Sequence, residues 1–359
     1  MLKKLDIYII KKFLGTFFFS ILLILSIAVI FDISEKIDDF LEKQAPLQAI
    51  VFDYYLNFIP YFANLFSPLF VFISVIFFTS KMAFNTEIIA ILSNGVSFKR
   101  MMFPYFLSAL LLALMTFFLS NFIIPNANKT RLAFEQKYIR NPYRNFNRNI
   151  HKQIKPGVFV YFESYTVENK IGYKFSIEKF NHNILVSKLN SNYIQWDSTK
   201  NVWTVHNYYI HNFNGTKETI IKGNELDTSI VLMPKDFVQR LNLVETMDYF
   251  KLNKFIEEQK LQGSENIDSF LAEKYKRFAN SFSTFILTLI GVSISSRKVR
   301  GGIGLHLGIG LMLSFSYILF MQLSTNIALG GSMPISLGVW IPNILYAVIG
   351  IFLYRSAPK

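Results

Sequence analysis

The sequence predicts an integral membrane protein with six transmembrane helices and one inserted all-β domain. Two observations carry this prediction. The chain of 359 residues is 52% hydrophobic and only 17% charged, and its long runs without charged residues are interrupted once by a segment rich in short, strand-like stretches. A soluble domain rarely combines such a composition with uncharged runs of bilayer length.

Three apolar runs precede the insert, namely Phe13–Phe31, Tyr54–Ser80 and Met101–Asn128. Each is long enough to cross a bilayer as a helix. Pro60 and Pro68 lie inside the second run, where kinks are tolerated because neighbouring groups satisfy the freed carbonyls. The first run follows a basic start, but it is long and no small-residue cleavage motif follows it. We therefore expect a retained span rather than a signal peptide.

The character of the chain changes between residues 126 and 270. Stretches rich in aromatic and β-branched residues alternate with turn signals such as Asn181–Asn183 and Asn214-Gly215. This spacing favours an all-β sandwich or an open roll. The pattern then becomes helical over Met247–Leu261, with Gly263 as the expected stop.

Three further spans are predicted after the insert. The first ends at Ser296, ahead of a basic group, and the uncharged stretch 301–354 is too long for one span. Gly330–Pro334 divides that stretch into two. Lys and Arg concentrate in the short loops on one side of the predicted membrane. By the positive-inside rule, both termini and the turn 81–100 are cytoplasmic and the insert is periplasmic.

We therefore expect residues 1–125 to form three spans, 126–270 a periplasmic β domain with a C-terminal helix, and 271–359 three more spans. A short helix is predicted at 85–95, in the cytoplasmic turn between the second and third spans. Asn85 or Thr86 would cap it, and Asn94-Gly95 would end it. A short apolar helix in water has little reason to exist alone, so it either lies against its own bundle or docks a soluble partner.

The sequence lacks the residues that several functional classes require. The sequence has no GxxxxGK[ST] phosphate loop, so the chain does not hydrolyse ATP by that route. It has no cysteine and no HExxH motif, and His206 and His211 are expected on opposite faces of a strand. We assign no catalytic residue, metal site or cofactor. The apolar runs hold no carboxylate, which disfavours proton- or sodium-coupled transport and places the energy source outside the chain.

The net charge of +13 lies largely at the ends of spans, which favours a membrane over nucleic acid as its partner. The segment 129–155 is particularly basic. It is either a solvated face with general headgroup contacts or a path for a phosphorylated amphiphile.

Five short motifs occur in order along nearly the whole chain: Leu5-Asp6-x-Tyr8-Ile9-x-Lys11-x-Phe13-Leu14, Glu87-x-x-Ala90-x-x-x-Asn94-Gly95-Val96-Ser97, Pro125-Asn126-Ala127-Asn128, Arg300-Gly301-Gly302 and Trp340-Ile341-Pro342-Asn343. With six spans and the insert, the chain resembles the LptF/LptG (YjgP/YjgQ) permease family of the lipopolysaccharide export ABC transporter. One departure is Asn280 after Arg277-Phe278-Ala279, where the family often has proline. The length, with no extra domain, favours an LptG-like paralogue.

The resemblance implies a periplasmic β-jellyroll, a heterodimer with a second LptF/LptG-type permease, and a cytoplasmic ABC ATPase dimer. It implies that lipopolysaccharide is extracted from the outer leaflet of a Gram-negative inner membrane, through a gate involving the first and fifth spans. The lipid would pass to a periplasmic jellyroll bridge protein. The expected ATPase-coupling residues are Glu87, Ile91, Leu92 and Gly95. The expected lipid-binding residues are Lys36, Lys43, Lys129, Arg131, Lys137 and Arg140.

Two other functional classes stay open at this point. The chain could be a membrane-anchored lipid-modifying enzyme with its site on the β domain, although no nucleophile or metal constellation is evident. It could instead be a scaffold for envelope assembly, in which case lipopolysaccharide export would continue after depletion of the chain.

Overall fold

The computed structural model describes residues 3–139, 148–166, 168–182, 184–215, 217–228, 230, 232–234, 241–264, 266–299 and 302–357. The chain divides into two compact units. The first, which we call the helical unit, contains Met1–Arg140, Val244–Tyr249 and Leu271–Lys359. The second, the sheet unit, contains Asn141–Leu243 and Phe250–Phe270. The functional boundaries that we place at residues 126 and 271 stay predictions.

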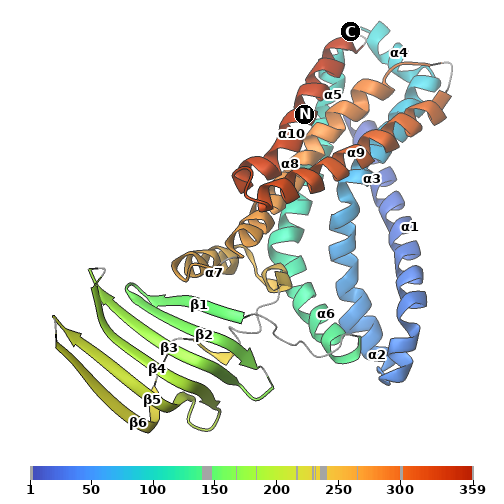
Figure 1. The fold of residues 1–359 in the computed structure, drawn as a ribbon. Coiled ribbons are helices and arrows are strands. Elements are labelled where there is room, and N and C mark those ends of the chain that lie inside the picture. The colour runs from blue at the N-terminus through green and yellow to red at the C-terminus, as the bar shows by residue number, and fades with distance from the viewer. Residues whose placement is uncertain are drawn as a thin grey trace. The chain divides into compact units, whose positions relative to one another are not determined.

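Among the described residues, six helical segments are long and apolar enough to cross a membrane, which confirms the predicted membrane-helical fold class (Figure 1). They are α1 (Lys4–Glu42), α3 (Leu56–Phe84), α5 (Phe98–Phe118), α8 (Ile267–Ser295), α9 (Gly302–Leu329) and α10 (Ile335–Ser356). The second begins as α2 (Leu47–Ala49) and the π-helical η1 (Ile50–Tyr55), and the third continues through the π-helical η2 (Leu119–Ile123) into α6 (Ile124–Tyr138).

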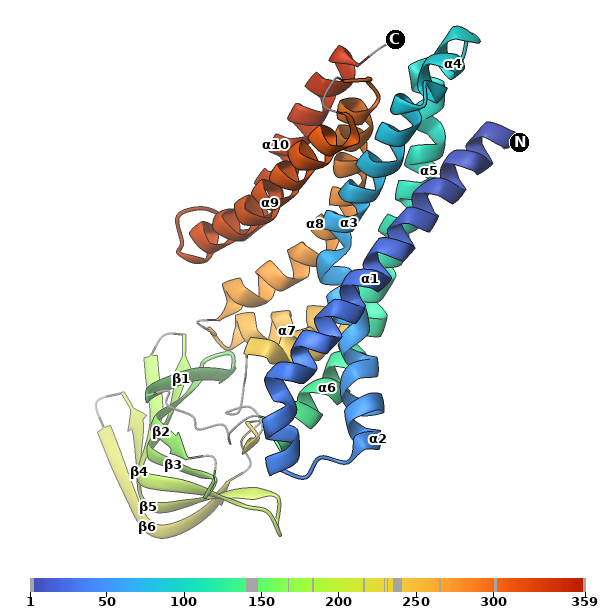
Figure 2. The same ribbon diagram turned by 90° about the vertical axis from the view of Figure 1, so that its right-hand side faces the viewer.

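The helical unit has two ends that matter for function. Both termini and the short helix α4 (Glu87–Ser93) lie at one end, which we call the α4 end (Figure 2). The opposite end, where α6 finishes, is called the insert end. Between them, Phe13 of α1, Phe78 of α3 and Tyr105 of α5 stack in one buried cluster. This packing joins α1, α3 and α5 along their length.

The sheet unit is one antiparallel sheet whose strands follow the chain order from β1 to β6. Its strands are β1 (Arg148–Lys155), β2 (Val158–Thr166), β3 (Ile171–Asn181), β4 (Ile184–Asp197), β5 (Val202–Asn214) and β6 (Lys217–Thr228), and a helix α7 (Tyr249–Leu261) follows. In the part of the chain that the structure describes, this single sheet matches an open roll rather than a two-sheet sandwich. The expected helix and its stop at Gly263, which has φ +64°, are confirmed.

The side-chain alternation of β5 changes once along the strand. In β5 the inward residues are Trp203 and Val205 at one end but Tyr208 and Ile210 at the other. Between them Asn207 has φ 53°, a left-handed conformation that shifts the side-chain alternation by one, while the pairing of β5 with β4 and β6 keeps the same register on both sides of it. The expectation that His206 and His211 lie on opposite faces is therefore wrong, because both fall on the outer face.

Candidate functional site

The helix α4 forms the turn between α3 and α5. Thr86 precedes it in the left-handed conformation, with φ 63°, and its side chain makes no capping hydrogen bond to the helix. Gly95 follows it with φ 80°, a conformation that favours glycine because a side chain would be strained there. The short helix and its glycine stop lie where the sequence places them.

The two faces of α4 have different surroundings. Ile88 is 1% exposed, and Ile91 and Leu92 pack partly buried against the same cluster of α1, α3 and α5 residues. Ile89 is 54% exposed on the other side of the helix. Three of its apolar residues thus hold α4 to the bundle, while Ile89 is left for water or a partner. The expected coupling residues Ile91 and Leu92 belong mainly to the inner face.

Two polar contacts tie the start of α1 to the turn that contains α4. The Tyr8 hydroxyl donates to the Glu87 carboxylate at 2.9 Å. Arg100 donates from both terminal nitrogens to the two Asp6 carboxylate oxygens, each at 2.7 Å. A bidentate pair of this kind fixes orientation as well as distance. The turn is therefore attached to α1 as well as to α3 and α5, an arrangement that sequence reasoning missed.

A close seam joins α3 and α9 near the α4 end. Ser80 Oγ and His306 Nδ1 share a hydrogen bond of 2.8 Å, and His306 is 3% exposed. One turn further along both helices, a Cβ atom added to Gly310 would come closer than 3.0 Å to Ile76 Cδ1. His306 is thus a polar group that packs α9 against α3. Among the described residues, nothing outside the backbone of α9 itself lies within 4 Å of a Cβ built at Gly304 or Gly308.

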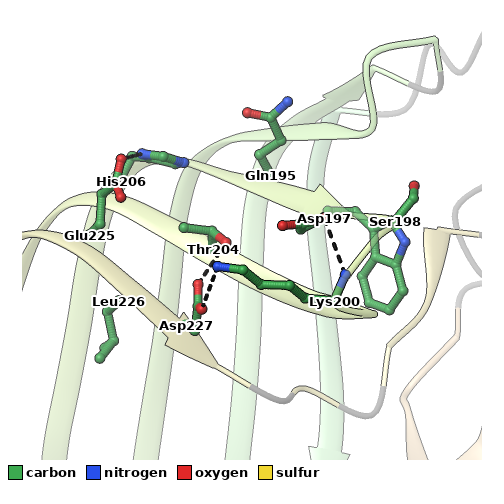
Figure 3. Close-up of a pocket in the computed structure, with 10 residues that line it drawn as sticks. Gln195, Asp197, Ser198, Lys200, Thr204, His206, Glu225, Leu226 and Asp227 are labelled. Atoms are coloured by element: carbon green, nitrogen blue, oxygen red, sulfur yellow. Dashed lines mark hydrogen bonds and ion pairs between the residues drawn. The ribbon is translucent and has the colours of Figure 1, made fainter.

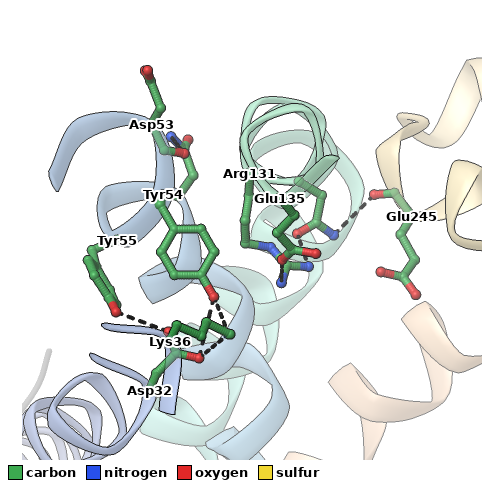
Figure 4. Close-up of polar contacts among 10 residues, drawn as sticks. Asp32, Lys36, Asp53, Tyr54, Tyr55, Arg131, Glu135 and Glu245 are labelled. Carbon is green, nitrogen blue, oxygen red and sulfur yellow. Dashed lines mark hydrogen bonds and ion pairs between the residues drawn. The ribbon is translucent and has the colours of Figure 1, made fainter. Parts of the chain in front are cut away.

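Those expected lipid-binding residues that the structure describes lie at the insert end, and two of them, Lys36 and Arg131, are engaged internally (Figure 4). Lys36 binds the Asp32 carboxylate and the Tyr54 hydroxyl, and Tyr55 donates to the same Asp32 at 3.1 Å. Only 22% of the Lys36 side chain is exposed. This network joins the last turns of α1 to η1.

Arg131 is held in the same way on α6. It donates to Glu135 at 2.9 Å and to Asn128 at 3.2 Å, and it lies over the Tyr61 ring with 4.9 Å to the centroid. Such a buried, hydrogen-bonded guanidinium positions helices and leaves little surface for a phosphate.

The other described candidates for lipid binding are less engaged by neighbouring side chains. Lys43 donates to the Ile139 carbonyl at 3.2 Å, whereas Lys129 and Lys137 are exposed on α6. Lys137 lies 4.8 Å from the Tyr138 ring centroid. Arg140 lies outside the described residues. Lipid binding by this set stays a prediction, and the exposed ammonium groups of Lys129 and Lys137 are the best placed for it.

One hollow on the sheet unit is lined by hydrogen-bonded acids. It has a volume of about 620 Å³ on β4 to β6 (Figure 3). Asp227 accepts from Thr204 at 2.8 Å and from Lys200 at 3.3 Å. These hydrogen bonds lower the pKa of Asp227, and the bond from Thr204 has the largest effect. Hydrogen bonds from Thr199 likewise lower the pKa of Asp197. The hollow therefore carries an exposed ion-pair network on the sheet's outer face.

The fold and these sites define a multi-pass membrane protein with a β unit inserted between its third and fourth spans and a two-faced helix in the turn after its second span. The sequence profile described as "Lipopolysaccharide export system permease LptF/LptG" matches residues 7–356, and the chain belongs to this family. The match does not separate LptF from LptG, so the LptG-like assignment stays a prediction. No curated protein matches the chain significantly.

Proposed function

We propose that this chain is one of two permease subunits of an exporter that extracts lipopolysaccharide from the outer leaflet of the inner membrane and passes it to a periplasmic bridge protein. A separate cytoplasmic ABC ATPase supplies the energy. The observation that carries this proposal is the two-faced α4, with Ile88 buried and Ile89 exposed. The family match supports the cargo.

The proposed orientation places both termini and the α4 end in the cytoplasm and the sheet unit in the periplasm. The basic residues of the short loops support it through the positive-inside rule. In this orientation α4 faces the compartment that contains ATP.

The contacts around α4 suggest how ATP-driven motion reaches the lipid. A displacement of α4 acts on α1 through the Tyr8–Glu87 hydrogen bond and, across the same turn, through the Arg100–Asp6 ion pair. The same displacement acts on α3, whose seam with α9 contains the Ser80–His306 hydrogen bond. The first and fifth spans, which the family resemblance places at the lateral gate, are thus both connected to α4.

At the insert end, Lys129 and Lys137 would meet the phosphates of the lipid as it leaves the membrane. Lys36 and Arg131 would act differently, by holding α1 and α6 in place through their ion pairs with Asp32 and Glu135.

The experiment is co-purification of the ATPase with variants of α4. Ile89→Asp places a charge on the exposed face, so it should abolish co-purification while the chain itself stays folded. Glu87→Arg should weaken co-purification through loss of the Tyr8 contact. The matched control is Leu47→Asp, which alters a residue that is 76% exposed at the insert end and should change nothing. The docking proposal is wrong if Ile89→Asp retains the ATPase as well as Leu47→Asp does.

A further inference from the structure

A second polar cavity lies at the insert end of the helical unit, and the proposed function does not use it. It has a volume of about 310 Å³ and is lined by residues of α3, η2, α6, α8 and α9, together with the segment 244–249. The polar residues that matter here are Asn64, Ser120, Glu245, Glu273, Lys276 and Arg277.

Most charges around this cavity have partners. Arg277 donates to Glu273 at 3.0 Å and to the carbonyls of Val244 and Met247 at 3.0 and 2.8 Å. Arg131 and Glu135 form their own pair nearby. These contacts hold the 244–249 segment against α8 and fix the position of Glu245.

Three groups that line the cavity stand without partners among the described residues. The Glu245 carboxylate makes no hydrogen bond or ion pair there, as Figure 4 also shows for the residues drawn. Lys276 likewise has no partner in that part of the chain. The side-chain oxygen of Asn64 is buried without a donor, although its amide nitrogen donates to Ser120 at 3.0 Å.

Glu245 and Lys276 are partly buried, and the Asn64 oxygen is fully buried; polar groups left unpaired in such settings are costly. An acid and a base that line one cavity without pairing to each other indicate an occupant that carries both charges. Two acceptors, the Glu245 carboxylate and the Asn64 oxygen, suit an ammonium group with several N–H donors. The single ammonium of Lys276 suits a phosphate.

We propose that this cavity binds an aminoethyl phosphate group, with its ammonium at Glu245 and Asn64 and its phosphate at Lys276. The cavity lies at one end of membrane-spanning helices, where lipid headgroups are found. The group would therefore belong either to phosphatidylethanolamine of the bilayer or to a phosphoethanolamine substituent on the exported lipid, and the second source rests on the proposed function.

Lipid retention on the full-length chain tests the site directly. The detergent-purified chain is titrated with phosphatidylethanolamine, phosphatidylcholine or phosphatidylglycerol, and retained lipid is counted by native mass spectrometry. Phosphatidylethanolamine should be retained best. The quaternary ammonium of phosphatidylcholine cannot donate hydrogen bonds, and the glycerol headgroup of phosphatidylglycerol carries no positive charge. Glu245→Gln should reduce its retention about tenfold, the effect expected from the loss of one charge-assisted hydrogen bond.

Matched variants separate recognition from misfolding. Glu245→Asp keeps the carboxylate and should retain part of the preference for phosphatidylethanolamine. Lys276→Met should weaken retention, whereas Lys274→Met, two residues away on α8 and not lining the cavity, should not. Glu42→Gln alters an exposed acid of α1 at the same end and serves as the control for Glu245→Gln.

A second arm identifies the source of the group. ATP-driven release of lipopolysaccharide with and without phosphoethanolamine is compared in the reconstituted complex. A preference for the substituted lipid that Glu245→Gln abolishes assigns the site to the cargo, whereas retention of phosphatidylethanolamine without such a preference assigns it to the bilayer. Equal retention of all three phospholipids together with no cargo preference overturns the proposal. A complex that releases no lipid would refute the proposed function but leave the retention result intact.

Discussion

The α3–α9 seam predicts a substitution that damages the helix packing and a second substitution that repairs it. A Cβ atom added to Gly310 would collide with Ile76 Cδ1, while the other nearby Ile76 atoms, Cγ1 and Cγ2, lie at 3.7 and 3.8 Å in ordinary contact. Gly310→Ala therefore creates one specific clash. Ile76→Val removes the single atom with which the new methyl collides.

The magnitudes follow from these contacts. Overpacking costs about 1–3 kcal/mol, and alanine gains about 1 kcal/mol over glycine inside a helix, so Gly310→Ala should lose about 1 kcal/mol. Ile76→Val alone should lose about 1 kcal/mol through the space that it leaves. In the double variant the clash is gone, and the gain of about 1 kcal/mol from alanine offsets the loss of about 1 kcal/mol at Ile76, so its stability should return close to that of the wild type. The coupling energy between the two substitutions is then about 2 kcal/mol.

Thermal unfolding of the four proteins in one detergent, followed by tryptophan fluorescence, measures this coupling. Gly308→Ala is the control on the same helix, because a Cβ atom there would meet no described residue outside the backbone of α9 within 4 Å, and it should be neutral or stabilising. The proposed contact between Gly310 and Ile76 is wrong if Ile76→Val fails to restore the stability of Gly310→Ala, or if Gly308→Ala lowers stability as much as Gly310→Ala does.

Three other predictions concern α4, the cavity and the insert end. Ile88→Asp should destabilise the chain by roughly 3 kcal/mol because it buries a charge, whereas Ile89→Asp should leave its melting temperature unchanged; equal melting temperatures would contradict the two-faced helix. Burial raises the pKa of Glu245, so the folded chain holds its proton more tightly and stability falls as pH rises through that pKa. Glu245→Gln should therefore raise the melting temperature at neutral pH and lose this advantage near pH about 4; a lower melting temperature at neutral pH would refute it. Lys137→Ala should reduce lipopolysaccharide crosslinking without loss of stability, whereas Lys36→Met should lower stability, and the reverse result would contradict their assigned roles.

The helical part of the fold could be predicted because an uncharged run of bilayer length rarely occurs outside a membrane-spanning helix. The inner face of α4 was also visible in the sequence, since Ile88, Ile91 and Leu92 have the spacing of one helical stripe. That stripe marks the buried face, so the same spacing indicates Ile89 as the exposed residue. Our expectation chose Ile91 and Leu92 for docking because it considered the apolar segment as a whole.

Other features depend on contacts that a single sequence does not reveal. β1 was missed because its basic residues resembled a solvated loop, although Ile150 and Ile154 pack against the core of the sheet. The Arg100–Asp6 ion pair joins residues 94 positions apart, and only the shared presence of Asp6 and Tyr8 in the first family motif hinted at a role for this end of α1. The internal pairing of Lys36 requires Tyr54 from another helix, so its charge looked free in the sequence.

The central claim is that a separate ATPase acts through α4 to drive lipid export. The most direct test is release of lipopolysaccharide from proteoliposomes that contain the assembled complex, with wild type compared with Ile89→Asp. The wild-type complex should release lipid to a periplasmic acceptor only when ATP is present, and the variant should release none above the ATP-free level. Release by Ile89→Asp at the wild-type rate, or release by the wild type without ATP, would contradict the account.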